Sequence, residues 1–182
     1  MLNCCKTGLK MRYLLSDLYI AFNPATELRS PSWFHDGRGG ETELTKEELI
    51  IHGCFIRQRL QQQLPDLHYR ILKLHFKQPG DLPSAMADIN AIRPVVIEEA
   101  RIYSVDDNRF VDLCCLNECW RTDLFRTRQY GPMKRYAPFS RPELLSRRRR
   151  RISASLQVMK EEAVSMANNV LASSCDMERL VG

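Results

Sequence analysis

The sequence predicts a mostly α-helical protein, and three observations lead to this expectation. Apolar residues recur at helical spacing in several segments of the chain. Only 8 of the 182 residues are glycine, and Ala, Leu, Glu, Arg and Gln, which have high or neutral helix propensity, fill the long stretches. Apolar residues make up 44% of the chain, which is enough to bury a core. We therefore expect one compact helical domain.

The N-terminal region, residues 1–44, is expected to contain one short helix and a loop. Apolar residues over 12–22 have helical spacing, and Asn23-Pro24 ends that pattern. Two prolines and the run Asp36-Gly-Arg-Gly-Gly40 are typical of a loop over residues 23–42.

A helix pair is expected over residues 45–77. Thr45 and Glu48 have the spacing of a capping box, in which an N-terminal hydroxyl and a carboxylate three residues later satisfy free backbone amides. Leu64-Pro65 breaks the first helix near Gln63, and proline suits the first turn of the helix that follows. The second helix should turn these residues inward: Leu67, Ile71, Leu72, Leu74 and Phe76.

Residues 78–138 are expected to form a long insertion. Its first part is helical up to Pro94, which should interrupt the helix, and residues 95–103 fit a helix or a strand equally well. A further helix is expected over 109–126. It carries three cysteines, Cys114, Cys115 and Cys119, but no CxxC pair and no downstream pair of histidines. We therefore expect buried thiols and no metal site.

The C-terminal region, residues 139–175, has the pattern of a helix-turn-helix. A short helix from Pro142 to about Arg149, a tight basic turn and a longer helix from Ser153 are expected. In that motif the second helix enters the DNA major groove by its N-terminal end. The expected DNA-binding residues are Arg141, Arg147, Arg148, Arg149, Arg150, Arg151, Ser153, Ser155, Gln157 and Lys160.

Charge distribution supports a nucleic-acid partner. The net charge is +5, and the stretch from Arg126 to Arg151 holds ten Lys or Arg and one acid, Glu143, on an otherwise slightly acidic chain. Such a segment fits a polyanion-binding surface, although a solvated basic linker is the alternative. The arginines are expected mostly to contact phosphates, while Gln157 has the donor and acceptor to pair with adenine.

Several classes of protein are disfavoured by what the sequence lacks. It has no apolar run long enough for a membrane span and no secretory signal, and its seven cysteines are an odd number, so we expect a cytoplasmic protein with reduced thiols. No phosphate-binding loop, dinucleotide motif or nucleophile elbow is present. We therefore expect no catalytic residue, no cofactor and no enzymatic activity, with a small nuclease as the least favoured alternative.

The middle and the C-terminal part of the chain resemble a known family. The runs Leu49-Ile-Ile-His-Gly-Cys-Phe-Ile-Arg-Gln-Arg-Leu60 and Leu64-Pro-Asp-Leu-His-Tyr-Arg-Ile-Leu-Lys-Leu-His-Phe76 look like the paired helices of phage Q-type transcription antitermination proteins of the phage 21 branch. The run Phe139-Ser-Arg-Pro-Glu-Leu-Leu-Ser146 and the segment after Ile152 resemble the family's helix-turn-helix, which is similar to region 4 of sigma factors. The 78–138 insertion is longer than the link in compact members, whereas longer bacterial AlpA-type antiterminators would accommodate it.

The resemblance implies a function in transcription. Such a protein binds a duplex element near a promoter, joins RNA polymerase that still carries sigma factor, and suppresses termination downstream. A conventional helix-turn-helix regulator remains the main alternative, because it needs the same DNA contacts and no polymerase. An RNA-binding protein that uses the arginine-rich helix is the second alternative.

Overall fold

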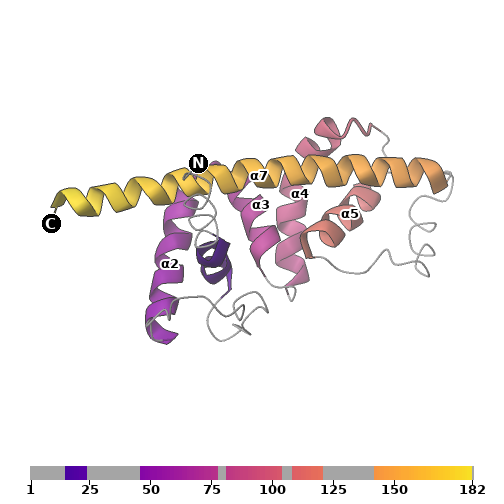
Figure 1. Cartoon of the computed structure of the whole chain (residues 1–182). Coiled ribbons are helices and arrows are strands. Elements are labelled where there is room, and N and C mark those ends of the chain that lie inside the picture. The colour runs from indigo at the N-terminus through magenta and orange to yellow at the C-terminus, as the bar shows by residue number, and fades with distance from the viewer. Residues whose placement is uncertain (1–14, 24–45, 78–80, 104–107, 121–141, 182) are drawn as a thin grey trace, which may run out of the picture. The chain divides into compact units, whose positions relative to one another are not determined.

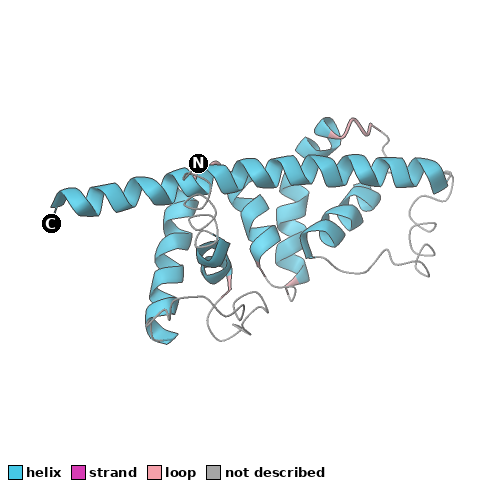
Figure 2. Ribbon diagram, in the orientation of Figure 1, coloured by secondary structure: helices cyan, strands magenta, loops and turns pink. Residues whose placement is uncertain are grey.

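The part of the chain that the structure describes is helical apart from short connections. The computed structural model describes residues 15–23, 46–77, 81–103, 108–120 and 142–181. A short helix covers residues 15–22. It is followed by α2 (Lys46–Gln63), α3 (Asp66–Phe76), α4 (Leu82–Glu99), α5 (Asn108–Trp120) and α7 (Pro142–Val181) (Figure 1). No strand occurs among these described residues (Figure 2), so the prediction of a mostly α-helical fold is confirmed.

The described helices belong to two compact units. The first unit comprises residues 1–64, 76–78 and 166–182, and the second comprises residues 65–75 and 79–165. The sequence predicts one compact domain with the 45–77 pair as its scaffold. In the structure α2 belongs to the first unit and nearly all of α3 to the second. Within the described helices, none is both long and apolar enough to cross a bilayer.

Each unit has its own buried residues. The first unit buries Leu18, Ala21, Phe22, Ile56, Leu60, Leu64 and Ala167. The second unit buries Ile71, Leu72, Leu74, Ile89, Ile92, Val96, Phe110, Val111, Cys115, Ile152 and Leu156. Helices α4 and α5 supply much of this second core. The segment 78–138, which the sequence predicts as an insertion, therefore contributes to the packed framework of that unit.

Two local features explain how the first unit is held together. The Asn23 side chain is buried, and its Nδ2 donates to the carbonyl oxygens of Tyr19 at 2.8 Å and Phe76 at 2.7 Å. The bond to Phe76 satisfies a carbonyl at the last residue of a helix, where intrahelical partners are missing, and the Tyr19 carbonyl also accepts from the Asn23 backbone amide at 3.1 Å. Gly53 of α2 lies so close to the 15–22 helix that an added Cβ would be 2.8 Å from the Ile20 carbonyl oxygen. Any larger residue at position 53 would force the two helices apart.

Helix α4 continues through Pro94, so the predicted interruption there is wrong. Proline removes one backbone donor from the helix ladder, but Ile89, Ile92 and Val96 are fully buried on either side of it. Burial of this apolar face therefore outweighs the loss of one hydrogen bond, and the ambiguous segment after Pro94 is helical up to Glu99.

The end of α4 is a Schellman motif with an unusual residue. The Ile102 amide donates to Ile97 O at 2.9 Å and the Arg101 amide to Glu98 O at 3.0 Å. Arg101 has a φ of 53°, a left-handed conformation that glycine usually adopts at this position. Ile102 is buried directly after it, and this apolar anchor helps to hold Arg101 in its strained backbone conformation.

Between Pro142 and Val181, the described part of the C-terminal region, the chain contains no turn, and the predicted turn between two helices is wrong there. Residues Pro142–Val181 form one helix of 40 residues (Figure 1). Neither glycine nor proline interrupts the arginine run, and arginine has high helix propensity. Leu145, Ile152 and Leu156 are spaced by seven and four residues and are all buried, so a continuous helix keeps them on one face. A turn after Arg149 would break that register.

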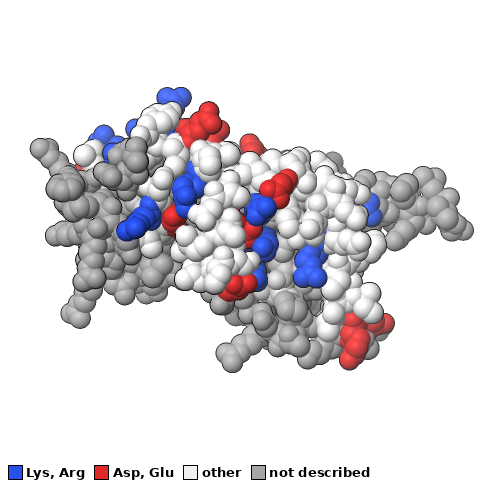
Figure 3. All heavy atoms as spheres, turned by 180° about the vertical axis from the view of Figure 1, so that it is seen from behind, with Lys and Arg blue, Asp and Glu red and all other residues white. Residues whose placement is uncertain are grey.

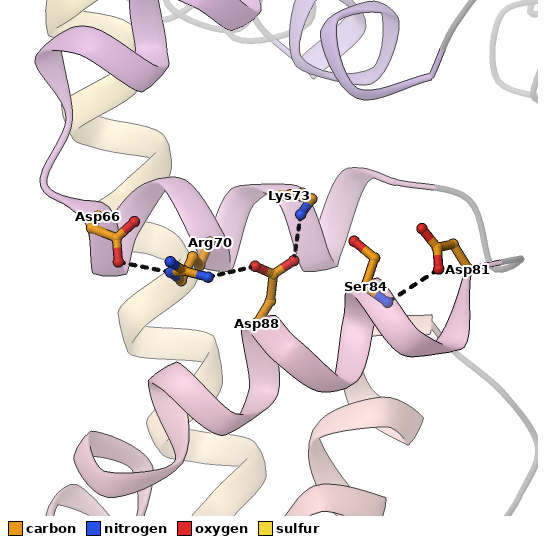
Figure 4. A network of polar contacts seen from close by, with 6 residues as sticks. All are labelled: Asp66, Arg70, Lys73, Asp81, Ser84 and Asp88. Carbon is orange, nitrogen blue, oxygen red and sulfur yellow. Dashed lines mark hydrogen bonds and ion pairs between the residues drawn. The ribbon is translucent and has the colours of Figure 1, made fainter.

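Buried and half-buried charges connect α3, α4 and α5 within the second unit. Asp88 of α4 has a side chain only 4% exposed, and its two oxygens accept from Arg70 Nη1 at 3.0 Å and Lys73 Nζ at 2.8 Å (Figure 4). Arg70 Nε also contacts Asp66 Oδ2 at 2.7 Å. The guanidinium of Arg93 donates to both carboxylate oxygens of Asp112, at 2.6 and 2.8 Å. These bonds fix the register between neighbouring helices.

Replacing Asp88 by alanine is expected to lower the free energy of unfolding by about 1.5–3 kcal/mol. The change leaves Arg70 and Lys73 without their shared counter-ion. The loss stays below that of a fully buried pair because these two side chains keep 32% and 28% of their surface exposed. The measurement is urea unfolding followed by circular dichroism. Asp66→Ala is the matched control, since Asp66 binds the same Arg70 but is 73% exposed; it should cost less than about 1 kcal/mol. Equal losses for the two variants would contradict this account.

Candidate nucleic-acid interface

The N-terminal half of α7 presents arginines on its outer side. Arg147, Arg150 and Arg151 are exposed, whereas Arg148 and Arg149 are half-buried. The opposite side of the helix is defined by four buried residues, Leu145, Ile152, Leu156 and Met159. We call Arg147, Arg150 and Arg151 the outer arginines. They point away from the core because a helix places residues two, five and six positions after Leu145 well outside its buried stripe.

Nine of the ten residues predicted to bind DNA lie on this helix. The tenth, Arg141, lies outside the described residues. Gln157 is exposed, and Ser153, Ser155 and Lys160 are half-buried. The predicted set is therefore brought onto one helix, although its members do not all share one face.

An open hollow lies beside the outer arginines. It has a volume of about 570 Å³ and is lined by Glu118 of α5 and by Ser146, Arg149, Arg150, Ser153, Ala154 and Gln157 of α7. Four of the predicted residues thus share this hollow. Ser155 lies on the other flank of α7, where its hydroxyl contacts Met159 Sδ at 3.9 Å. Glu118 and Ser146 were not predicted, because neither belongs to the basic run and Glu118 comes from a distant segment.

Gln157 has a partner on its own helix. Its Nε2 donates to Glu161 Oε1 at 2.7 Å, and both residues are exposed. An adenine edge would have to replace Glu161 as acceptor. Because the bond is exposed to solvent, this exchange replaces one hydrogen bond with another at little cost.

The cysteines of α5 are buried, as predicted. Cys114, Cys115 and Cys119 have at most 6% of their surface exposed. Burial raises the pKa of Cys114 and of Cys119 to about 12, and it also raises the pKa of Cys115. His75 Nε2 lies 3.7 Å from Cys119 Sγ. Across the described segments, no three His, Cys, Asp or Glu residues are grouped so that they could hold a metal ion. The thiols are therefore protonated core groups at neutral pH.

The face of the molecule drawn in Figure 3 carries both signs of charge. Lys and Arg side chains are scattered there among Asp and Glu, with uncharged surface between them. The outer arginines differ from this pattern, because three exposed cations fall within five consecutive residues of one helix. Such a local concentration of one sign is what a polyanion requires.

No family model matches the chain, and neither a curated protein nor a solved structure matches it.

Proposed function

We propose that the chain binds double-stranded DNA through the outer side of α7, between Arg147 and Gln157, and acts in transcription. The observation that carries this proposal is the cluster of outer arginines on one uninterrupted helix. Arginine neutralises phosphates and releases their counter-ions, which is the main source of affinity for duplex DNA. An α-helix also fits the width of the major groove.

The continuous helix changes the expected mode of binding. With no turn before Ser153, the N-terminal end of a recognition helix is not the part that enters the groove. The contact is that of a basic helix that lies across the groove, as in proteins whose basic regions are uninterrupted helices. Leu145, Ile152 and Leu156 hold the inner side of this segment in the core. The outer side chains therefore project from a rigid support, which lowers the entropy lost on binding.

Antitermination is the specific role that we propose in transcription. It is supported by the resemblance of residues 49–76 to the paired helices of Q-type antitermination proteins. The resemblance of the C-terminal segment is weaker, because the turn expected near residue 150 is part of a continuous helix. In this role the protein recognises a duplex element near a promoter, joins RNA polymerase with its sigma factor and suppresses termination downstream.

Transcription in vitro tests this role. The template carries DNA from the chain's own genomic neighbourhood with an intrinsic terminator downstream, and it is transcribed by purified polymerase with sigma factor. We expect read-through that requires both the protein and the upstream element, and a template with that element scrambled is the control. A change in initiation with termination unaltered contradicts antitermination and supports a conventional regulator. No effect on either step contradicts a role in transcription.

Gln157→Ala is expected to reduce discrimination between DNA sites by about 1–3 kcal/mol while changing the affinity for random duplex much less. The reason is that an amide reads the edge of a base, whereas the outer arginines contact every phosphate alike. Binding to the upstream element of the transcription template and to random duplex is measured by fluorescence anisotropy. Glu161→Ala is the matched control: it removes the present partner of Gln157 and keeps the amide, so discrimination should persist. An equal loss on both duplexes would show that Gln157 reads no base.

A further inference from the structure

Helix α2 exposes an apolar patch. Ile51 is 68% exposed, Phe55 56% and Ile50 38%, and the thiol of Cys54 between them is exposed as well. We call Ile50, Ile51, Cys54 and Phe55 the α2 patch. The opposite side of the same helix is already used, since Gly53, Ile56 and Leu60 are buried in the first unit. Large apolar residues on two adjacent turns of an outer helix face are a common mark of a protein interaction site.

Charge is distributed unevenly on either side of this patch. Glu47 and Glu48 are exposed in the first turn of α2. On the C-terminal side, Arg57 is exposed and Arg59 is half-buried. The outer side of the helix thus runs from acidic through apolar to basic over 13 residues.

This order of charges is complementary to itself in one orientation. When two such helices lie antiparallel, the acidic first turn of each falls beside Arg57 and Arg59 of the other. When they lie parallel, acid faces acid and base faces base, which is unfavourable. A two-fold axis that crosses the outer side of α2 at the level of residue 53 also places Ile51 of one copy against Phe55 of the other. Both large side chains then lose contact with water.

We propose that a second copy of this chain docks on the α2 patch, with the two α2 helices antiparallel. The interface is isologous, because the same residues serve on both sides and it closes as a dimer. It rests on observations from α2 alone and does not depend on the function proposed for α7. The dimer would present two sets of outer arginines to DNA.

Sedimentation equilibrium of the full-length chain tests the dimer. The monomer mass is 21.2 kDa, and we expect a reversible monomer–dimer equilibrium. Ile51→Lys and Phe55→Lys should each raise the dissociation constant roughly tenfold or more, since each places a charge in the apolar centre of the interface. Both positions are exposed, so the helical circular dichroism should be unchanged. Tyr103→Lys is the matched control: it replaces an apolar residue that is 76% exposed outside α2, and should leave the constant unchanged.

Charge exchange tests the orientation. Glu47→Arg alone and Arg57→Glu alone should each weaken the dimer several-fold, because each sets like charges against each other in the antiparallel pair. The variant that carries both substitutions should dimerise more strongly than either single variant, since the attraction between positions 47 and 57 of the two copies is restored with its signs exchanged. In a parallel dimer, the double variant would associate no more strongly than either single variant.

Three results would overturn the proposal. The first is a chain that stays monomeric, which would mean that the patch contacts another part of the same molecule or another protein. The second is self-association that Ile51→Lys and Phe55→Lys leave unaltered. The third is a double variant that associates no better than the two single ones. Binding of duplex DNA is recorded for the same variants at concentrations where the chain is monomeric, so a failure of the dimer is distinguished from a failure of DNA binding.

Discussion

Replacing the three outer arginines, Arg147, Arg150 and Arg151, together by alanine is expected to lower the slope of log affinity against log salt by about 2.7, which is about 0.9 for each lost phosphate contact. If these contacts act through counter-ion release, affinity for duplex DNA at 0.1 M salt falls on the order of several hundredfold. The side chains are exposed, so stability should change little. Titrations at several salt concentrations give both quantities.

A control for overall charge accompanies this experiment. Arg101 and Arg109 are also exposed but lie outside α7, and their joint replacement by alanine removes two positive charges from other surfaces. We expect this double variant to keep the native slope. If it lowers the slope as much per charge as the triple variant does, affinity follows net charge alone and α7 is not the interface.

Leu72→Ala is expected to lower the free energy of unfolding by about 2–5 kcal/mol. Leu72 is completely buried in α3, so the substitution removes apolar contacts and leaves a cavity that its neighbours fill only in part. The measurement is denaturant unfolding with a probe in the second unit. Leu82→Ala is the control, because Leu82 is 49% exposed and its truncation should cost less than about 1 kcal/mol. A loss below about 1 kcal/mol at Leu72 would mean that α3 does not pack as described.

Local signals in the sequence were sufficient for α2 and α3. Apolar spacing predicts both helices, and Pro65 marks the boundary between them, which the structure has between Gln63 and Asp66. The burial of Ile71, Leu72 and Leu74 is confirmed as well. These features depend on residues that are close in sequence, so periodicity and backbone restrictions determine them directly.

Tertiary burial decided the elements that were predicted wrongly. Pro94 indicates a break when considered locally, and the turn before Ser153 was expected from the helix-turn-helix pattern although the arginines themselves favour a helix. In the folded chain, Ile92 and Val96 must stay on the buried face of α4. Ile152 and Leu156 must likewise stay on the buried face of α7. A continuous helix achieves this in each case. Arg101 shows the same effect, because the burial of Ile102 holds a non-glycine residue in the left-handed region.

The candidate interface was predictable in composition and not in arrangement. The arginine run was evident from the sequence, but which arginines are exposed depends on the phase of α7 relative to its core. The division into outer arginines and the half-buried Arg148 and Arg149 follows from that phase. Glu118 enters the hollow from α5, and no spacing in the sequence relates it to Arg150. Such long-range contacts require the fold.

The most direct measurement of the central claim is a competition between nucleic acids for the intact chain. A labelled duplex DNA bound to the protein is displaced by unlabelled duplex, by single-stranded DNA of the same sequence and by an RNA stem-loop of equal length. The account predicts that duplex DNA competes best and that the triple replacement of the outer arginines abolishes this preference together with most of the affinity. Stronger competition by the RNA stem-loop would contradict it and would make α7 an arginine-rich RNA-binding helix.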